Sequence, residues 1–238
     1  MDPIALQAMI AAENSHPWYR ARLIFVQSAV KFLSSSSATI LDFGCGSGAA
    51  LEVCKNNGFK MTLGLDVSDY CVNATKARGI EARKIDSTMP SLDDNYDLII
   101  CLDVLEHLED DLGYLRMFKS HLKENGRILV SVPAHQFLWS HHDVVNHHYR
   151  RYSKSSFTRL VDQSQLRIVN FRYWNSLLFP LFVVSRILGK IQKEINSNEF
   201  ANPPKILSGF LHFILKREAL HRFLSKVPGL SIIAILEV

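Results

Sequence analysis

The stretch ILDFGCGSGAAL (residues 40–51) decides the fold, because it joins a short apolar run to three closely spaced glycines. Gly44, Gly46 and Gly48 follow Asp42, and a helical pattern begins at about Gly48. Glycines placed after a strand let the backbone approach a ligand closely, at a helix N-terminus that favours anionic groups. A nicotinamide-binding turn has the spacing G-x-G-x-x-G, whereas the spacing here is G-x-G-x-G, which disfavours a nicotinamide oxidoreductase.

Strand and helix patterns alternate outward from this turn. Apolar strands are predicted over residues 39–43, 61–66, 81–85, 96–102 and 127–132, with helices between them that end near Gly58, Gly79 and Lys123. A helix is predicted before the first strand, over 17–33, and another over 153–163. Two more strands are predicted over 166–173 and 230–238. Such alternation is typical of an α/β fold in which helices cover both faces of a mostly parallel sheet.

Composition restricts the class of protein. The chain has 238 residues, of which 47% are hydrophobic, enough for the core of one domain. The longest apolar segment, residues 177–184, is far shorter than the roughly 20 residues that span a bilayer, and no signal-peptide pattern opens the chain. The four cysteines lack metal-ligand spacing, so we expect reduced thiols and a cytoplasmic location.

Basic residues are concentrated in the C-terminal part of the chain. Residues 144–238 hold 14 of the 27 basic residues but only 5 of the 23 acidic ones. This excess predicts an anionic acceptor, a membrane surface or a nucleic acid as partner, and the alternative is a solvated basic surface without a partner.

The stretch LDFGCGSG resembles the first motif of class I S-adenosylmethionine (SAM)-dependent methyltransferases of the bacterial type (methyltransferase-11/12/23-like). LGLDVS, KIDS and YDLIICLDVLEHL follow in the order that this family shows, and the resemblance covers residues 17–175. It implies a three-layer Rossmann-like sandwich with a seven-stranded sheet in the order 3-2-1-4-5-7-6, strand 7 being antiparallel. It also implies SAM as the methyl donor and S-adenosylhomocysteine as the product.

The resemblance assigns the SAM contacts. Asp42 would lie near the ammonium group of SAM, Asp66 would bind the ribose hydroxyls and Asp86 would mark the adenine, because ionised carboxylates accept hydrogen bonds. Before the first strand, ENSHPWYRAR would cover SAM with an aromatic side chain and pair Arg22 with its carboxylate; the alternative is a core Trp18 and a surface Arg22. The full expected set is Tyr19, Arg22, Asp42, Phe43, Gly44, Cys45, Gly46, Gly48, Asp66, Val67, Asp86, Ser87, Cys101, Leu102, Asp103 and His107.

The acceptor side is expected in the His-rich segment SVPAHQFLWSHHDVVNHHYRRYS (residues 131–153), because it follows the fifth strand. His135 and His148 are candidate general bases, together with His107 of the EHL segment. Arg150, Arg151 and Tyr152 would bind a carboxylate or phosphate of the acceptor. A purely structural loop, in which Asp143 pairs with one of the two arginines, is the alternative. The histidine spacing matches no closed zinc pattern, so no metal site is predicted.

The domain organisation follows from these patterns. Residues 1–38 are predicted to form an N-terminal helical cap, 39–175 the SAM-binding core, 176–229 a helical insertion between strands 6 and 7, and 230–238 the last core strand. The insertion has two apolar helical stretches with basic residues, and Pro180 should kink or start the first. Residues 174–224 could contact a membrane, cover an apolar acceptor or simply pack against the core or a partner subunit.

These observations together predict an enzyme that transfers the SAM methyl group to oxygen or nitrogen of a small-molecule or lipid-linked acceptor, in the cytoplasm and with peripheral membrane contact. A non-catalytic protein that kept the fold is one alternative. A nucleic-acid methyltransferase is another, but LDVLEH stands where that group carries Asn/Asp-Pro-Pro-Tyr/Phe, and no RNA-binding appendage is recognisable. The sequence does not identify the acceptor or the oligomeric state.

Overall fold

One seven-stranded sheet organises the computed structural model, which describes residues 7, 10–13, 15–86, 89–187, 204–221 and 227–238. The strand order is β3-β2-β1-β4-β5-β7-β6, as predicted. Strands β1 to β5 run parallel, and β7 lies antiparallel between β5 and β6. The strands are β1 (Thr39–Phe43), β2 (Met61–Asp66), β3 (Glu81–Lys84), β4 (Tyr96–Leu102), β5 (Leu122–Pro133), β6 (Arg167–Trp174) and β7 (Ser231–Glu237).

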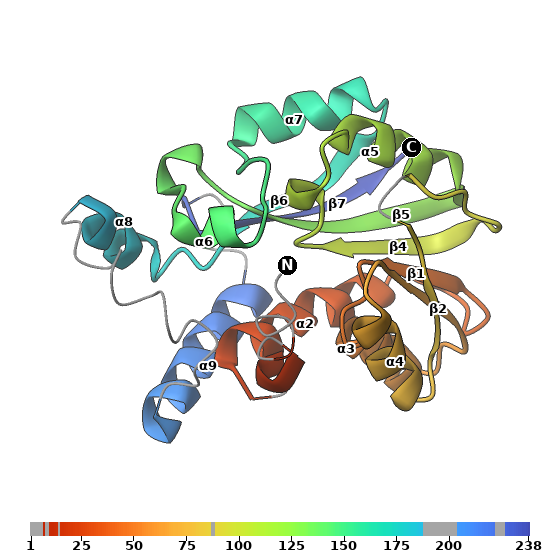
Figure 1. Cartoon of the computed structure of the whole chain (residues 1–238), viewed down its shortest axis with the longest axis horizontal. Coiled ribbons are helices and arrows are strands. Elements are labelled where there is room, and N and C mark those ends of the chain that lie inside the picture. Colours follow the sequence, from red (N-terminus) through yellow and green to blue (C-terminus); the bar gives the residue numbers. More distant parts are fainter. Residues whose placement is uncertain (1–6, 8–9, 14, 87–88, 188–203, 222–226) are drawn as a thin grey trace.

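Helices cover both faces of the sheet. Figure 1 shows α5 and α7 on one side and α2, α3 and α4 on the other. The helices are α2 (Pro17–Val30), α3 (Ala49–Asn56), α4 (Asp69–Ala77), α5 (Asp111–Ser120), α6 (His141–Val145), α7 (Lys154–Gln163), α8 (Phe179–Ile187) and α9 (Lys205–Leu220), with short 3₁₀ turns η1 (Leu105–His107) and η2 (Gln136–Leu138). The predicted α/β three-layer architecture is therefore confirmed.

Alternation along the strands divides the core into two clusters. In β1, Leu41 and Phe43 face the α5–α7 side whereas Ile40 faces the α2–α3 side. In β4, Ile99 and Ile100 divide in the same way, and both are fully buried. Because successive side chains of a strand point to opposite faces, a sheet that is covered twice needs apolar residues at every position.

The boundary between α5 and β5 differs from the prediction. The helix ends at Ser120, and β5 already begins at Leu122, which pairs with Tyr96. The next paired residue of β5 is Arg127, so the intervening residues form an irregularity in the strand. Asn125 adopts a positive φ of 63° there, which explains why the segment interrupts both the helical and the strand pattern.

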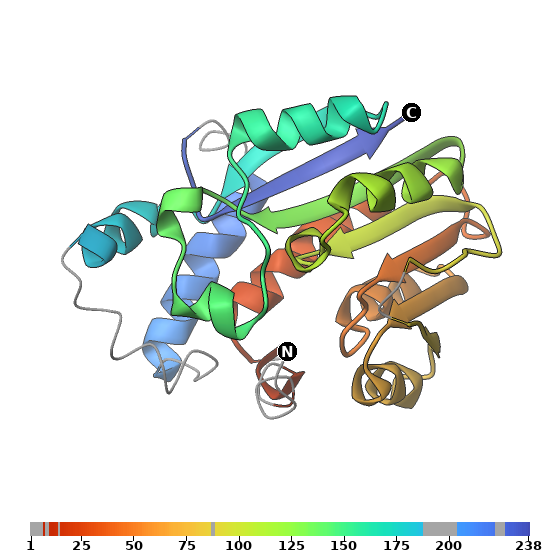
Figure 2. The same ribbon diagram turned by 45° about the horizontal axis from the view of Figure 1, so that its top comes forward.

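The insertion between β6 and β7 packs against the N-terminal helix. Helices α2 and α9 lie side by side on one side of the sheet (Figures 1 and 2). Trp174, buried at the end of β6, contacts the rings of Trp18 at 5.5 Å and Phe25 at 5.3 Å, and its indole N–H donates to the Leu215 carbonyl. Pro180 is the second residue of α8, so it marks a helix start, where its missing N–H has no cost.

Within the described ranges, no helix combines the length and the apolar character that crossing a bilayer requires. Helices α8 and α9 are short and amphipathic, lie beside the sheet and expose several large apolar side chains.

The buried core makes a direct prediction about stability. Phe118 is fully buried against the rings of Phe43 and Tyr114, so Phe118→Ala should lower the free energy of unfolding by about 3–5 kcal/mol. Phe32, which is 57% exposed and lies under the Arg127 guanidinium, is the matched control, and Phe32→Ala should cost at most about 1 kcal/mol. Urea denaturation measures both values, and equal losses would contradict this description of the core.

Candidate active site

A large cavity opens where the carboxyl ends of β1, β2 and β4 meet. Its volume is about 1710 Å³, larger than the roughly 300–1,000 Å³ of a typical small-ligand site, so it has room for a cofactor and an acceptor together. Helix α2, the turn before α3, the segments after β4 and β5, and the insertion all contribute to its wall. Of the residues predicted for SAM, catalysis or acceptor binding, the cavity is lined by Tyr19, Arg22, Asp42, Phe43, Gly44, Cys45, Gly46, Asp66, Val67, Asp86, Leu102, Asp103, His107, His148 and Arg151.

The glycine turn after β1 provides a backbone wall for this cavity. Gly44 has a φ of 77°, and a Cβ atom there would collide with Cγ2 of Val104. The N–H groups of Gly44 and Cys45 donate to the Leu65 carbonyl, which holds the turn against β2. A side chain at Gly44 would therefore both strain the backbone and push the turn away from the segment after β4.

Carboxylates mark the ends of neighbouring strands, as predicted. Asp42, near the end of β1, is only 3% exposed. Burial raises its pKa to about 7, although the positive charge of Arg22 opposes this shift. Burial also raises the pKa of Asp66, whose carboxylate accepts hydrogen bonds from the N–H groups of Gly46 and Ser68, at 3.0 and 2.9 Å. Both carboxylates thus face the cavity from successive strands.

Two of the predicted adenine-side residues follow β3. Asp86 lines the cavity, whereas Ser87 lies outside the described residues.

Gly48, the last glycine of the turn after β1, does not line the cavity; with a φ of 80° it forms the N-cap of α3. A side chain at Gly48 would meet Thr75 of α4, 2.8 Å from its Cγ2, so this glycine permits close packing of two helices.

Helix α2 contributes to the cavity wall an arginine that pairs with a carboxylate of the chain itself, and its pairing with the SAM carboxylate stays a prediction. Arg22 pairs with Asp103 at 2.5 Å and lies over the rings of Trp18, at 5.0 Å, and Tyr19, at 5.5 Å. Burial alone would lower the pKa of Arg22, but the nearby Asp103 carboxylate outweighs this effect and raises it. Asp103 adopts a φ of 57°, a left-handed conformation that is rare outside glycine, and this places it opposite α2.

Glu13 is a cavity residue that sequence reasoning missed. It is 5% exposed, lines the cavity and accepts a hydrogen bond from the Ser47 hydroxyl in the glycine turn. Burial raises the pKa of Glu13. No sequence pattern distinguishes this glutamate, because its position depends on how the segment before α2 returns to the turn.

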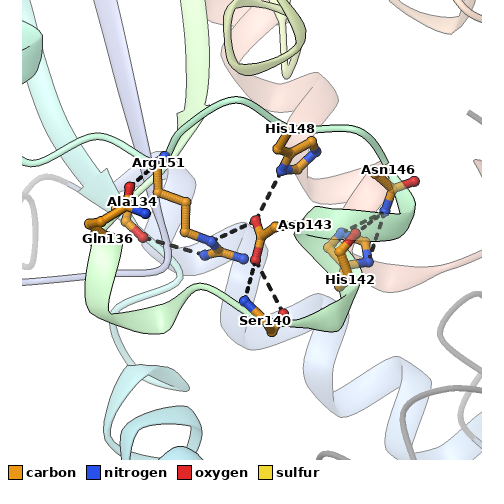
Figure 3. Close-up of polar contacts among 8 residues, drawn as sticks. All are labelled: Ala134, Gln136, Ser140, His142, Asp143, Asn146, His148 and Arg151. Carbon is orange, nitrogen blue, oxygen red and sulfur yellow. Dashed lines mark hydrogen bonds and ion pairs between the residues drawn. The ribbon is translucent and has the colours of Figure 1, made fainter.

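The His-rich segment is organised around one buried carboxylate. Asp143 is fully buried and accepts hydrogen bonds from the Nδ1 atom of His148 at 2.9 Å, the Nε atom of Arg151 at 2.7 Å and the backbone N–H of Ser140 at 2.8 Å (Figure 3). Burial alone would raise the pKa of Asp143, but the contacts with His148 and Arg151 lower it below its usual range. Of the two arginine pairings that the structural-loop alternative allowed for Asp143, the one with Arg151 is present.

Two histidines and a glutamate meet at the end of the cavity beside this segment. The rings of His107 and His148 lie edge to face with centroids 4.5 Å apart, and Glu106 lies next to them with 1% exposure. Burial lowers the pKa of His107 to about 4, with a further contribution from His148, so His107 is neutral at physiological pH. Burial raises the pKa of Glu106 well above its usual range, and the nearby charge of Asp103 adds to this.

Arg150 and Tyr152 do not line the cavity. The Tyr152 hydroxyl donates to the Asp111 carboxylate at 2.8 Å, and Arg150 pairs with the same carboxylate, also at 2.8 Å. Burial raises the pKa of Tyr152, and Asp111 raises it further. Both side chains therefore fix the segment to the start of α5 instead of binding an acceptor.

His135 and Cys101 also point away from the cavity. His135 has a φ of 63°, and its ring stacks on Tyr173 at 5.3 Å, while burial lowers its pKa. Cys101 is fully buried in β4 on the α5–α7 side. The backbone conformation thus turns the predicted base His135 toward β6, and the strand alternation turns Cys101 into the core.

This sheet and its cavity define a Rossmann-like methyltransferase. Residues 19–170, more than half of the chain, match a family model described as "Methyltransferase domain", and the chain belongs to this family. The cofactor of the class is SAM. The residues present fit it, since the turn at Gly44 leaves no room for a side chain, and the acceptor-only carboxylates of Asp42 and Asp66 suit an ammonium group and a ribose.

Named relatives are similar over part of the chain. Over 136 residues it is 33% identical to the ubiquinone biosynthesis O-methyltransferase of Rickettsia canadensis, covering 55% of this chain and 51% of that protein. The protein of the same name from Marinobacter nauticus is 29% identical over 120 residues, covering 46% of this chain and 49% of that protein. The chain thus spans about half the length of these relatives.

A solved structure confirms the fold. A SAM-dependent methyltransferase from Clostridium acetobutylicum superposes with a TM-score of 0.58 over 92% of both chains, at 14% sequence identity. The strand order and the antiparallel β7 described above are those of the Rossmann-like methyltransferase fold.

The unusual pKa of Asp42 predicts a pH dependence of cofactor binding. An ammonium group favours ionised Asp42, which predominates only above its pKa of about 7, so affinity for S-adenosylhomocysteine should fall with falling pH. Between about pH 8 and pH 6 the ionised fraction falls about tenfold, and the Kd should rise about tenfold. Isothermal titration calorimetry measures this change.

The matched variant Asp42→Asn should bind more weakly, and its Kd should vary little over the same range. An equal pH dependence in the two proteins would show that another group causes it.

Proposed function

We propose that this chain transfers the methyl group of SAM to a hydroxyl oxygen of a small-molecule acceptor. One observation supports this most: the carboxylates at the ends of β1 and β2 and the His107–His148 pair line one and the same cavity. The relatives named as O-methyltransferases of ubiquinone biosynthesis favour oxygen over nitrogen as the acceptor atom.

The residues would divide the work by position. The glycine turn and the N-terminus of α3 would hold the carboxyl end of SAM, Asp42 its ammonium group and Asp66 its ribose hydroxyls. Bound SAM supplies a methyl group on a positively charged sulfur, which is already a strong electrophile. The protein then has to align the acceptor oxygen with that methyl group and exclude water.

Helix α2 would exclude water from the cofactor side. Trp18 and Tyr19 line the cavity, and Arg22 links α2 to Asp103 after β4. On the other side, an acceptor hydroxyl would lie against His107 and His148, where it loses its proton. His148 is suited to this place because Asp143 holds its Nδ1 atom and fixes the ring orientation.

The acceptor carries an apolar chain in this proposal. The insertion adds an apolar part to the cavity wall, which is lined there by Leu178, Leu181, Phe182, Leu207 and Leu211. Several of these residues are also exposed at the surface, Leu181 at 64%. An apolar wall that continues into an exposed apolar surface suits a lipid-linked molecule that remains partly in a bilayer.

The same surface would contact an anionic membrane peripherally. Ile206 is 91% exposed on α9, with Phe210 and Phe213 exposed on the same helix. Lys216 and Arg217 follow them, and their charges suit anionic headgroups. The chain would then act at the cytoplasmic surface of a membrane without crossing it.

The acceptor class can be tested by phase partition. The chain is incubated with methyl-labelled SAM and an extract of its native cells, and the label should enter the organic phase. Asp66→Ala, which loses the ribose contact, should reduce that label by at least about tenfold. Label in the aqueous phase alone would contradict a lipid-linked acceptor, and no transferred label in either phase would contradict the methyltransferase proposal.

Membrane contact can be tested by sedimentation with vesicles that contain phosphatidylglycerol. The double change Phe210→Ser and Phe213→Ser should reduce the bound fraction about tenfold, because each ring contributes apolar burial at the interface. Val169→Ser on β6, 46% exposed, is the control and should leave binding unchanged. Equal binding of all three proteins, or no binding of the wild type at low salt, would overturn membrane contact through α9.

A further inference from the structure

Glu106, His107 and His148 bring three metal-ligating groups together at the acceptor end of the cavity. One carboxylate oxygen and two imidazole nitrogens all lie within 4.8 Å of one another. Glu106 and His107 come from η1, directly after β4, whereas His148 comes from the segment after α6. Residues 106 and 148 are far apart in the sequence, so histidine spacing alone could not predict this group.

The Glu106 carboxylate is not satisfied by the protein. It is 1% exposed, and its Oε2 atom has no hydrogen-bond partner among the described residues. A buried polar atom without a hydrogen-bond partner destabilises the folded chain, because it has lost water and gained nothing in return. A cation between Glu106 and the two imidazoles would provide the missing partner.

The surroundings orient the two rings as they do around bound metals. Asp143 accepts a hydrogen bond from the Nδ1 atom of His148 (Figure 3), so Nε2 is the nitrogen that remains for the metal-ligating group. His107 in turn hydrogen-bonds the backbone of Asn146. Histidine ligands of metals characteristically use their second nitrogen to contact a carboxylate or a backbone carbonyl, and this fixes both tautomer and ring orientation.

We infer that Glu106, His107 and His148 bind one divalent first-row transition-metal ion, with a remaining position open for the acceptor hydroxyl. Two imidazoles and one carboxylate form a donor set that suits zinc and its neighbours, whereas magnesium and calcium prefer sites of oxygen ligands only. The prediction of no metal site rested on histidine spacing alone, and this proposal departs from it.

The ion would make the hydroxyl a better nucleophile. An oxygen bound to a divalent cation loses its proton more readily, and the proton passes to solvent; when the ion is bound, His107 and His148 hold it and do not take that proton themselves. A lone pair of that oxygen then forms the O–C bond to the methyl group, while the C–S bond breaks and its electron pair remains on sulfur. This role of the ion depends on the proposed methyl transfer, but metal binding itself does not.

Zinc binding to the purified full-length chain tests the inference without an activity assay. After removal of metals by a chelator, titration with Zn²⁺ alone should give one ion per chain by calorimetry. Glu106→Gln and His148→Ala should each weaken binding by about tenfold or more. His141→Ala removes a neighbouring histidine outside the group and should leave the Zn²⁺ affinity unchanged.

A second measurement, the thermal unfolding midpoint, distinguishes the loss of a metal ligand from misfolding of a variant. Zn²⁺ should raise the thermal unfolding midpoint of the wild type and of His141→Ala, but not that of a folded Glu106→Gln protein. No Zn²⁺ binding by the wild type, or equal affinity in Glu106→Gln, would overturn the inference.

Binding of S-adenosylhomocysteine, measured on the same samples, separates the two ideas. Its binding without Zn²⁺ binding would remove the metal site and leave the methyltransferase proposal standing. Zn²⁺ binding without S-adenosylhomocysteine binding would support the metal site and contradict the methyltransferase proposal.

Discussion

The proposed acceptor side of the cavity depends on the buried carboxylate of Asp143. It holds the side chains of His148 and Arg151 and the backbone at Ser140, while the N–H of Tyr149 donates to the Glu106 carbonyl and joins the same segment to η1. Removing one partner of a buried charge is strongly destabilising, by about 3–5 kcal/mol. The segment is thus fixed before any ligand binds, and little ordering has to occur on binding.

The two halves of the cavity are built differently. The proposed cofactor half uses side chains at the ends of β1 and β2, whose positions the parallel sheet determines. The proposed acceptor half uses the segment after β5 and the inserted helices, which the sheet does not constrain in the same way. A chain of this design can change its acceptor while its cofactor contacts stay in place, which is why the fold alone does not identify the acceptor.

The sequence predicted what depends on local patterns. Strand periodicity and turn glycines gave the sheet, and Asp42 and Asp66 were predicted at one edge because parallel strands end together. Arg22–Asp103 and Glu106–His148 depend on tertiary packing between distant segments, so no spacing rule could find them. His135 failed as a cavity residue because its backbone φ of 63° turns the ring toward β6, and a sequence pattern carries no such information.

The position of β7 has a consequence for how the chain folds during synthesis. β6 is the edge strand, and its neighbour in the sheet is β7, which is made only after the whole insertion. Until Ser231–Glu237 have left the ribosome, β6 has no strand to pair with and β5 presents an open edge. Open edges readily pair with other chains, so the nascent protein is prone to aggregation at this stage. The stage ends when β7 pairs with both β5 and β6.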